Sequence, residues 1–220
     1  MGSISKADAC AELLERCLRR QEWSAELLDR AIAVDHGRAF VSVVVERLGD
    51  LFEPQLCSIY KRLFAEAIAR VAPDLTRRVR RSTAFHRAPE SASRVYVLSR
   101  VTLGADVAVT SVLLDAAKQR YPDAEIVFVG PRKNFELFEN DPRIGHREAP
   151  YARGGTLEDR LRASASLWLD DGIVLDPDSR LSQLGLIEIC PESNYFFFAR
   201  VIRRSAWAAA FLTPSLESLL

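Results

Sequence analysis

The sequence predicts an α/β protein in which a small helical bundle precedes a Rossmann-like parallel sheet with helices on both faces. Up to about residue 76, apolar residues recur at helical spacing, whereas from residue 94 short apolar runs alternate with helical segments. Strands and helices that alternate at this spacing form right-handed βαβ units, which build parallel sheets. We therefore divide the chain into a helical bundle (1–76), a basic linker (77–93), a sheet domain (94–204) and a tail (205–220).

Composition excludes several classes of protein. The chain has 220 residues, of which 48% are hydrophobic and 27% charged, as in an ordinary globular protein. Thirty basic residues balance thirty acidic ones, so no net field attracts nucleic acid. The four cysteines form no CxxC pair, which argues against a zinc site. The N-terminus lacks the apolar segment of a signal peptide, and no apolar run could span a bilayer. We expect a soluble, cytoplasmic protein without metal or cofactor.

Four helices are expected in the bundle. Ser5 and Ser24 are N-cap candidates for the first two, and Gly37 is placed to end the second. The third covers residues 40–51, although its run of valines would also suit a strand. The fourth has the clearest spacing and ends before Pro73. Its apolar residues are Leu56, Ile59, Tyr60, Leu63, Phe64, Ile68 and Val71.

The linker is strongly basic. Between Arg77 and Arg94, six arginines face Glu90 alone, which gives a net charge of +5. These arginines are Arg77, Arg78, Arg80, Arg81, Arg87 and Arg94. Such a run can bind phosphate or nucleic acid. Since Phe85 is the one aromatic residue within it, we favour a solvated connector, or arginines that pair with nearby acids.

The sheet domain contains four expected strands, at residues 95–98, 125–130, 172–176 and 195–198. Helices are expected at 106–121, at 133–140, and after Thr156, which can cap a third. The residues of the first helix that we expect to face the sheet are Val109, Val112, Leu113, Ala116 and Ala117.

Three loops carry candidate chemistry, because ligands bind at the carboxyl ends of strands in an open parallel sheet. Asp106 follows the first strand and is either a helix N-cap or a functional carboxylate. Asp176 and Asp178 follow a later strand and could hold a divalent metal, but we favour a proline-stiffened turn in which Arg180 pairs with the acids. The segment 153–156 (Arg-Gly-Gly-Thr) could hold an anion at a helix N-terminus, or Thr156 is simply a cap.

The stretch 95–144 resembles the opening of the lipopolysaccharide heptosyltransferases, glycosyltransferase family 9. In that family a strand is followed by Gly-Asp-Val, a Thr four residues after the Asp, and a helix that ends in Tyr-Pro-Asp-Ala. The matching residues here are Gly104, Asp106-Val107, Thr110, Tyr121-Pro122-Asp123-Ala124, Ile126 to Gly130 and Asp141-Pro142-Arg143-Ile144. The strand that ends in Val174-Leu175-Asp176 is similar to a later strand of the family that borders the acceptor pocket. The resemblance extends over residues 94–204.

The resemblance implies the acceptor-side half of a two-domain GT-B fold in a bacterial enzyme of lipopolysaccharide biosynthesis. Such an enzyme transfers a sugar from a nucleotide-diphosphate donor to a hydroxyl of a glycolipid or glycan, without a metal. Asp106 would be the general base, and Gly104, Thr110 and Asp176 would bind the acceptor. The donor would bind only through a missing or partner domain. A peripheral membrane contact, and an oligomer formed through the apolar tail (Trp207, Phe211, Leu212, Leu216), remain open.

Two alternatives stand beside this interpretation. The Rossmann-like half could be a non-catalytic binding or interaction module. A metal-dependent sugar transferase that uses Asp176 and Asp178 is the other alternative.

Overall fold

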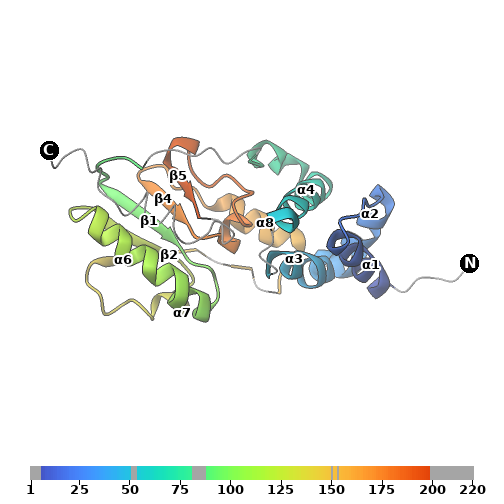
Figure 1. The fold of residues 1–220 in the computed structure, drawn as a ribbon, viewed down its shortest axis with the longest axis horizontal. Coiled ribbons are helices and arrows are strands. Elements are labelled where there is room, and N and C mark those ends of the chain that lie inside the picture. The colour runs from blue at the N-terminus through green and yellow to red at the C-terminus, as the bar shows by residue number, and fades with distance from the viewer. Residues whose placement is uncertain (1–5, 51–53, 81–87, 150, 153, 199–220) are drawn as a thin grey trace, which may run out of the picture. The chain divides into compact units, whose positions relative to one another are not determined.

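The computed structural model describes residues 6–50, 54–80, 88–149, 151–152 and 154–198 (Figure 1). The chain divides into two compact units. Unit 1 consists of Met1–Val79 with Ala152–Ala165, and unit 2 consists of Arg80–Tyr151 with Ser166–Leu220. The predicted N-cap at Ser5 and the apolar residues of the tail lie outside the described residues. Arg81, Phe85 and Arg87 of the linker also lie outside them.

Unit 1 is helical, as its apolar spacing predicts. Its helices are α1 (Lys6–Leu18), α2 (Ala25–Ala33), α3 (Glu46–Asp50) and α4 (Pro54–Val71). Ser24 caps α2, since its side chain accepts a hydrogen bond from the backbone N–H of Leu27 at 3.1 Å. The valine-rich segment is helical and not a strand: η2 (Phe40–Val45) is a π-helical stretch that leads into α3. Pro73 begins a 3₁₀ turn, η3 (Pro73–Arg78), directly after α4.

The end of α2 depends on three consecutive left-handed residues. Asp35, His36 and Gly37 have φ values of 48°, 52° and 80°, within the 3₁₀ turn η1 (Val34–Gly37). A Cβ at Gly37 would lie 2.6 Å from the Cβ of Leu157, so only glycine fits there. The predicted stop at Gly37 thus marks both a turn and a close approach between distant segments.

Helix α8 (Leu157–Ser166) belongs largely to unit 1, although it follows the third strand of the sheet in sequence. Arg160 pairs with Glu46 at 3.3 Å and Arg162 with Asp74 at 3.3 Å. Arg38 donates to the carbonyl of Gly154 at 2.9 Å. We had expected this helix to cover the sheet. Instead Leu157 and Leu161, both fully buried, complete the core of the helical unit.

Unit 2 is built on a five-stranded, all-parallel sheet in the order β3-β2-β1-β4-β5. The strands are β1 (Arg94–Leu98), β2 (Glu125–Gly130), β3 (Ile144–Glu148), β4 (Ile173–Asp176) and β5 (Tyr195–Phe197). In the central pairs, Val97 of β1 lies beside Phe128 of β2 and Leu175 of β4. The strand order reverses between β1 and β4, as in a Rossmann-like fold. The predicted α/β fold is therefore confirmed.

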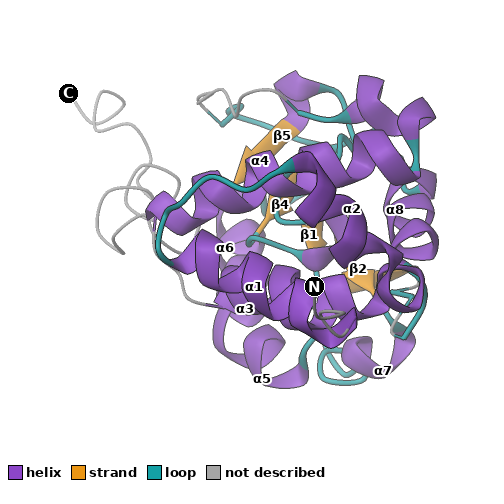
Figure 2. Cartoon of the chain, turned by 90° about the vertical axis from the view of Figure 1, so that its right-hand side faces the viewer, coloured by secondary structure: helices purple, strands orange, loops and turns teal. Residues whose placement is uncertain are grey.

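One face of the sheet carries the main hydrophobic core of unit 2. It is formed by alternate strand residues, by α6 (Ser111–Arg120) and by α7 (Arg132–Phe135). Figures 1 and 2 show α6 running alongside the central strands. The core residues on the strands are Val95, Val97, Ile126, Phe128, Ile144, Ile173, Leu175 and Phe196. Alternation along each strand places their neighbours, among them Tyr96, Asp176 and Tyr195, on the opposite face.

A π-helical turn lies between β1 and the first crossover helix. The segment begins with α5 (Leu103–Ala105), continues as the π-helical η4 (Asp106–Thr110) and becomes α6. Within α6, Leu114 and Ala117 are buried, whereas Val112 is 58% exposed. Val112 precedes Ala117 by five residues, which places the two on nearly opposite sides of a helix. The expectation that Val112 faces inward was wrong for this reason.

Two further connections differ from the expected elements. The segment expected to be a helix at 133–140 contains only the short α7, followed by turns. Strand β3 was not expected, because its residues Ile-Gly-His-Arg-Glu carry little apolar character. The described connection between β4 and β5 contains two 3₁₀ turns, η5 (Arg180–Ser182) and η6 (Glu192–Asn194), instead of an α-helix.

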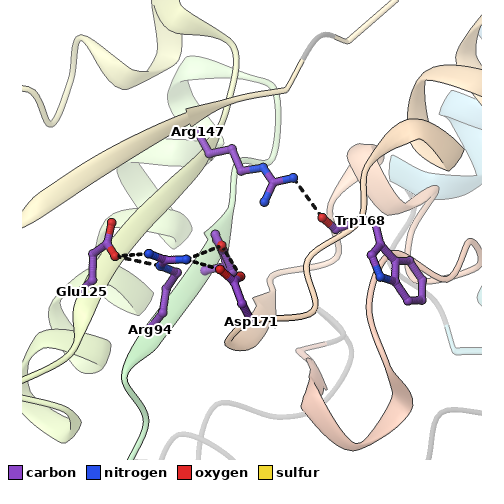
Figure 3. A network of polar contacts seen from close by, with 6 residues as sticks. Arg94, Glu125, Arg147, Trp168 and Asp171 are labelled. Carbon is purple, nitrogen blue, oxygen red and sulfur yellow. Dashed lines mark hydrogen bonds and ion pairs between the residues drawn. The ribbon is translucent and has the colours of Figure 1, made fainter.

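A polar network ties the amino end of β1 to its surroundings (Figure 3). Arg94 forms ion pairs with Glu125 and Asp171, and the Tyr96 hydroxyl donates to Asp171 at 2.6 Å. The Arg94 guanidinium and the Tyr96 hydroxyl hold the pKa of Asp171 below its usual range, the tyrosine hydrogen bond being the larger cause. Arg147 on β3 donates to the carbonyl of Trp168 at 2.9 Å. Arg94, the last arginine of the basic run, is thus paired with two acids.

Candidate functional site at the carboxyl edge of the sheet

The candidate site lies where β1 and β4 end side by side, which is the position that binds ligands in open parallel sheets. Both predicted carboxylates are there. Asp176 is the last residue of β4, and Asp106 lies eight residues beyond the end of β1. Both side chains are fully buried. The sequence therefore placed these two acids at the correct edge but gave no indication of their burial.

Asp106 accepts four hydrogen bonds. Its Oδ1 accepts from the backbone N–H of Arg100 and the Thr110 hydroxyl, each at 2.7 Å. Its Oδ2 accepts from the Ser99 hydroxyl at 2.7 Å and from the side-chain amide of Asn134 at 2.6 Å. These donors come from the end of β1, from η4 and from α7. One carboxylate thus joins the two loops that follow β1 and β2.

The structure does not place Asp106 at a helix N-cap. The helical segment begins at Leu103, its N-cap is Thr102, and the backbone N–H of Asp106 already donates to the Thr102 carbonyl at 2.9 Å. The capping alternative is therefore wrong for this residue. A general base must lie within hydrogen-bond reach of the proton it removes. An acceptor hydroxyl could reach Asp106 only by replacing one of its four donors.

The other predicted acceptor-binding residues differ in accessibility. Thr110 is fully buried and its hydroxyl is bonded to Asp106. Gly104 is exposed, and a Cβ added there would meet nothing within 4 Å. Of the predicted residues, Gly104 alone therefore presents itself to solvent at this edge.

Asp176 is held by a second set of donors. Its Oδ2 accepts from the Ser182 hydroxyl at 2.5 Å and from the Tyr195 hydroxyl at 2.6 Å, and its Oδ1 accepts from the Ser179 N–H at 2.6 Å. Burial nevertheless raises the pKa of Asp176 to about 6, although these three hydrogen bonds act in the opposite direction. Burial, together with the carboxylate of Asp176, raises the pKa of Tyr195 well above its usual range.

This arrangement does not favour the proposed metal pair. Both oxygens of Asp176 are directed to protein donors, and Asp178 adopts a left-handed conformation with a φ of 63°. Within the described part of the chain, no group of three or more His, Cys, Asp or Glu side chains could hold a metal ion. The residues fit a buried turn better than they fit a divalent cation.

The two carboxylates are linked, residue by residue, through a chain of hydrogen-bonded residues. The Ser179 hydroxyl donates to the carbonyl of Ser99 at 2.5 Å, while the Ser99 hydroxyl donates to Asp106. The chain therefore runs from Asn134 through Asp106, Ser99, Ser179 and Asp176 to Tyr195. It crosses the carboxyl edge from the loop after β2 to β5.

Close packing and strain accompany this chain. A Cβ at Gly130, the last residue of β2, would lie 2.4 Å from the Cβ of Ser99, so glycine is required there. Buried Val101 has a φ of 69°, which is unusual for a β-branched residue. Left-handed backbone recurs in the loop after β4, at Asp178, Gln183 and Leu184. Such strain persists only where surrounding contacts hold it.

Sequence reasoning missed five residues whose side chains hold or link the two carboxylates: Ser99, Asn134, Ser179, Ser182 and Tyr195. Ser99 and Ser179 could have been found, because each follows an expected strand within a few residues. Asn134 and Tyr195 come from elements distant in sequence, and only the tertiary structure brings them to these carboxylates.

The two remaining candidates are occupied by contacts within the chain. Thr156 accepts from the N–H of Asp159 at 3.1 Å, and Asp159 accepts from the N–H of Thr156 at 2.9 Å, which is a reciprocal cap of α8. In the basic run, Arg80 is buried and pairs with Glu192, and Arg78 donates to the carbonyl of Ala165. Arg80 and Arg94 thus pair with acids, as one interpretation expected, whereas Arg78 bonds a backbone carbonyl.

None of the described helices combines the length and apolar character needed to cross a membrane. No protein-family model, curated protein or solved structure matches this chain.

Proposed function

We propose that unit 2 is a sugar-acceptor-binding domain of the heptosyltransferase-like type, acting with a donor-binding domain in transfer from a nucleotide-diphosphate sugar. The observation that carries the proposal is the position of Asp106 and Asp176. They follow the two adjacent strands at which the sheet order reverses, and this is where such sheets bind ligands.

The same proposal assigns Asp106 the role of general base, under one condition. An acceptor hydroxyl must take the place of one donor, and the Asn134 amide is the candidate because it comes from a different loop than the other three. Withdrawal of Asn134 would leave the contacts to Ser99, Arg100 and Thr110 in place. The carboxylate would then be oriented by three donors and bonded to the hydroxyl that it deprotonates.

A specific observation favours a second candidate, a non-catalytic binding module. Every oxygen of both carboxylates already accepts hydrogen bonds from the protein. In that case Asp106 and Asp176 only fix the loops, and ligands contact the exposed surface around Gly104.

Acceptor binding can be measured without a donor. We would titrate ¹⁵N-labelled protein with oligosaccharides released from lipopolysaccharide and follow the backbone amides. The proposal predicts shifts concentrated at residues 99–104 and 178–180. Shifts confined to other parts of unit 2, or no binding of any such glycan, would overturn it.

The two candidates differ in what Asp106→Asn does. In a transfer assay with a donor-binding partner present, loss of the base should lower kcat by about 10²- to 10⁴-fold. Asp123→Asn is the control, because Asp123 is exposed and lies far along the chain at the turn after α6. Normal turnover by Asp106→Asn, with acceptor binding retained, would assign the residue to architecture alone.

A further inference from the structure

A groove on the outer surface of unit 2 lies between α6 and the segment that connects α7 to β3. Its volume is about 530 Å³, within the range of small-ligand sites. It extends from Ser111, at the start of α6, to Lys118 and Ile144. It shares no residue with the hydrogen-bond chain of the carboxyl edge.

One wall of the groove is apolar. Leu114 and Ile144 are buried at its base, Phe138 is half-buried, and Leu137 is 44% exposed. The ring of Phe138 is held by Phe128, with centroids 5.3 Å apart. The wall is therefore a fixed apolar surface that remains accessible from solvent.

The other end of the groove is polar and charged. Lys118 bonds Asp141 at 2.6 Å and Asp115 at 2.8 Å, and Arg143 lies beside Asp141, to which its backbone N–H donates. The ammonium of Lys118 lowers the pKa of Asp141, and the carboxylates of Asp115 and Asp141 raise the pKa of Lys118, so Asp141 and Lys118 both stay charged. The guanidinium of Arg143 donates instead to the carbonyl of Pro122 at 2.8 Å, so one ammonium faces two carboxylates in the groove and an anion is not favoured as a ligand.

Hydrogen-bonding capacity nevertheless remains open. Asp115 is 66% exposed and bonds Lys118 through one oxygen. The Asn140 carboxamide, also exposed, has no hydrogen-bond partner among the described residues. A carboxylate accepts and a carboxamide both donates and accepts, so the pair suits groups that can do either.

We propose that this groove binds a neutral polyhydroxylated ligand, namely a sugar unit. Sugar hydroxyls both donate and accept, and would bond Asn140, Asp115 and the remaining N–H of Lys118. The C–H face of the ring would pack on Leu137 and Phe138. As a subsite for acceptor sugars beyond the reacting one, the assignment rests on the proposed function, but the groove is tested separately from the carboxyl edge.

The test uses maltotriose and chitotriose as neutral probes on the ¹⁵N-labelled full chain. We expect shifts at the amides of Leu137, Asn140 and Lys118, with a Kd of about millimolar, as one or two hydrogen bonds and a small apolar contact would give. Asn140→Ala should weaken binding roughly fivefold, the effect of one net hydrogen bond. Leu137→Ala should weaken it by a similar factor.

Leu18→Ala is the matched control for Leu137→Ala. Leu18 belongs to unit 1, is 43% exposed and does not line the groove, so its variant should bind maltotriose normally. If neither sugar shifts the groove amides at millimolar concentration, or if n-octylamine or inorganic phosphate binds there instead, the assignment is overturned. Shifts at residues 99–104 report on the proposed function alone, so the two failures are distinguishable.

Discussion

Replacement of Asp176 by Asn should change how the stability of unit 2 depends on pH. Burial raises the pKa of Asp176 to about 6 in the folded protein, from 3.8 when the chain is unfolded. The folded state therefore binds more protons between these values, and its stability falls as the pH rises through this window. A difference of about two pKa units corresponds to roughly 3 kcal/mol that ionisation of Asp176 costs at neutral pH.

Asn is a close substitute at this position. Its carbonyl oxygen can accept from the N–H of Ser179, as Oδ1 of Asp176 does. The hydroxyls of Ser182 and Tyr195 can reorient and accept from its NH₂ group, because a hydroxyl both donates and accepts. The variant should thus keep the hydrogen bonds and lose the titration.

Urea unfolding at pH 4, 5, 6 and 7 measures the effect, and hydrogen exchange of the β4 and β5 amides assigns it to the sheet. Relative to Asp176→Asn, the native protein should lose roughly 2 kcal/mol between pH 4 and pH 7, because an unfolded carboxyl of pKa 3.8 is already more than half ionised at pH 4. Asp171→Asn is the control: the pKa of Asp171 is lowered, so its contribution is lost only as the pH falls below about 4. Parallel pH profiles for the native protein and Asp176→Asn would refute the reasoning.

Three further predictions concern architecture. Asp106→Ala leaves four hydrogen-bond donors without their acceptor and should lower the free energy of unfolding by about 4 kcal/mol. Loss of a simple helix cap would lower it by about 1 kcal/mol, and urea unfolding decides between the two values. Gly37→Ala should cost about 2–4 kcal/mol, because alanine is strained at a φ of 80° and its Cβ would overlap Leu157; a change of Tm below a degree would contradict this. Cleavage at a protease site inserted between Arg80 and Ala88 should give two fragments that co-elute in gel filtration, because unit 1 takes residues from both; separate elution would refute the division into units.

Local pattern was sufficient for most elements of the fold. Apolar spacing predicted α4, and apolar runs predicted β1, β2 and β4 nearly to the residue. Strand β3 escaped because an edge strand with one neighbour needs few apolar residues. The exposure of Val112 also escaped, because Val112 is as apolar as its buried neighbours although it lies on the side of α6 away from Ala117.

The candidate site shows a similar limit. Strand ends identified Asp106 and Asp176, since both lie just beyond buried runs. Whether such a carboxylate faces a ligand or the protein depends on donors from elsewhere in the chain. For Asp106 that donor is Asn134, 28 residues away, and for Asp176 it is Tyr195, 19 residues away.

The recruitment of α8 into unit 1 has a consequence for biosynthesis. During translation, α1 to α4 leave the ribosome long before Leu157 and Leu161 are made, although these leucines lie in the same core. Loop-closure entropy must be overcome before such distant contacts contribute. Part of the apolar surface of the first helices therefore stays uncovered until three strands of the sheet have been synthesised. Chaperone binding to nascent chains should accordingly end only after residue 165 has emerged.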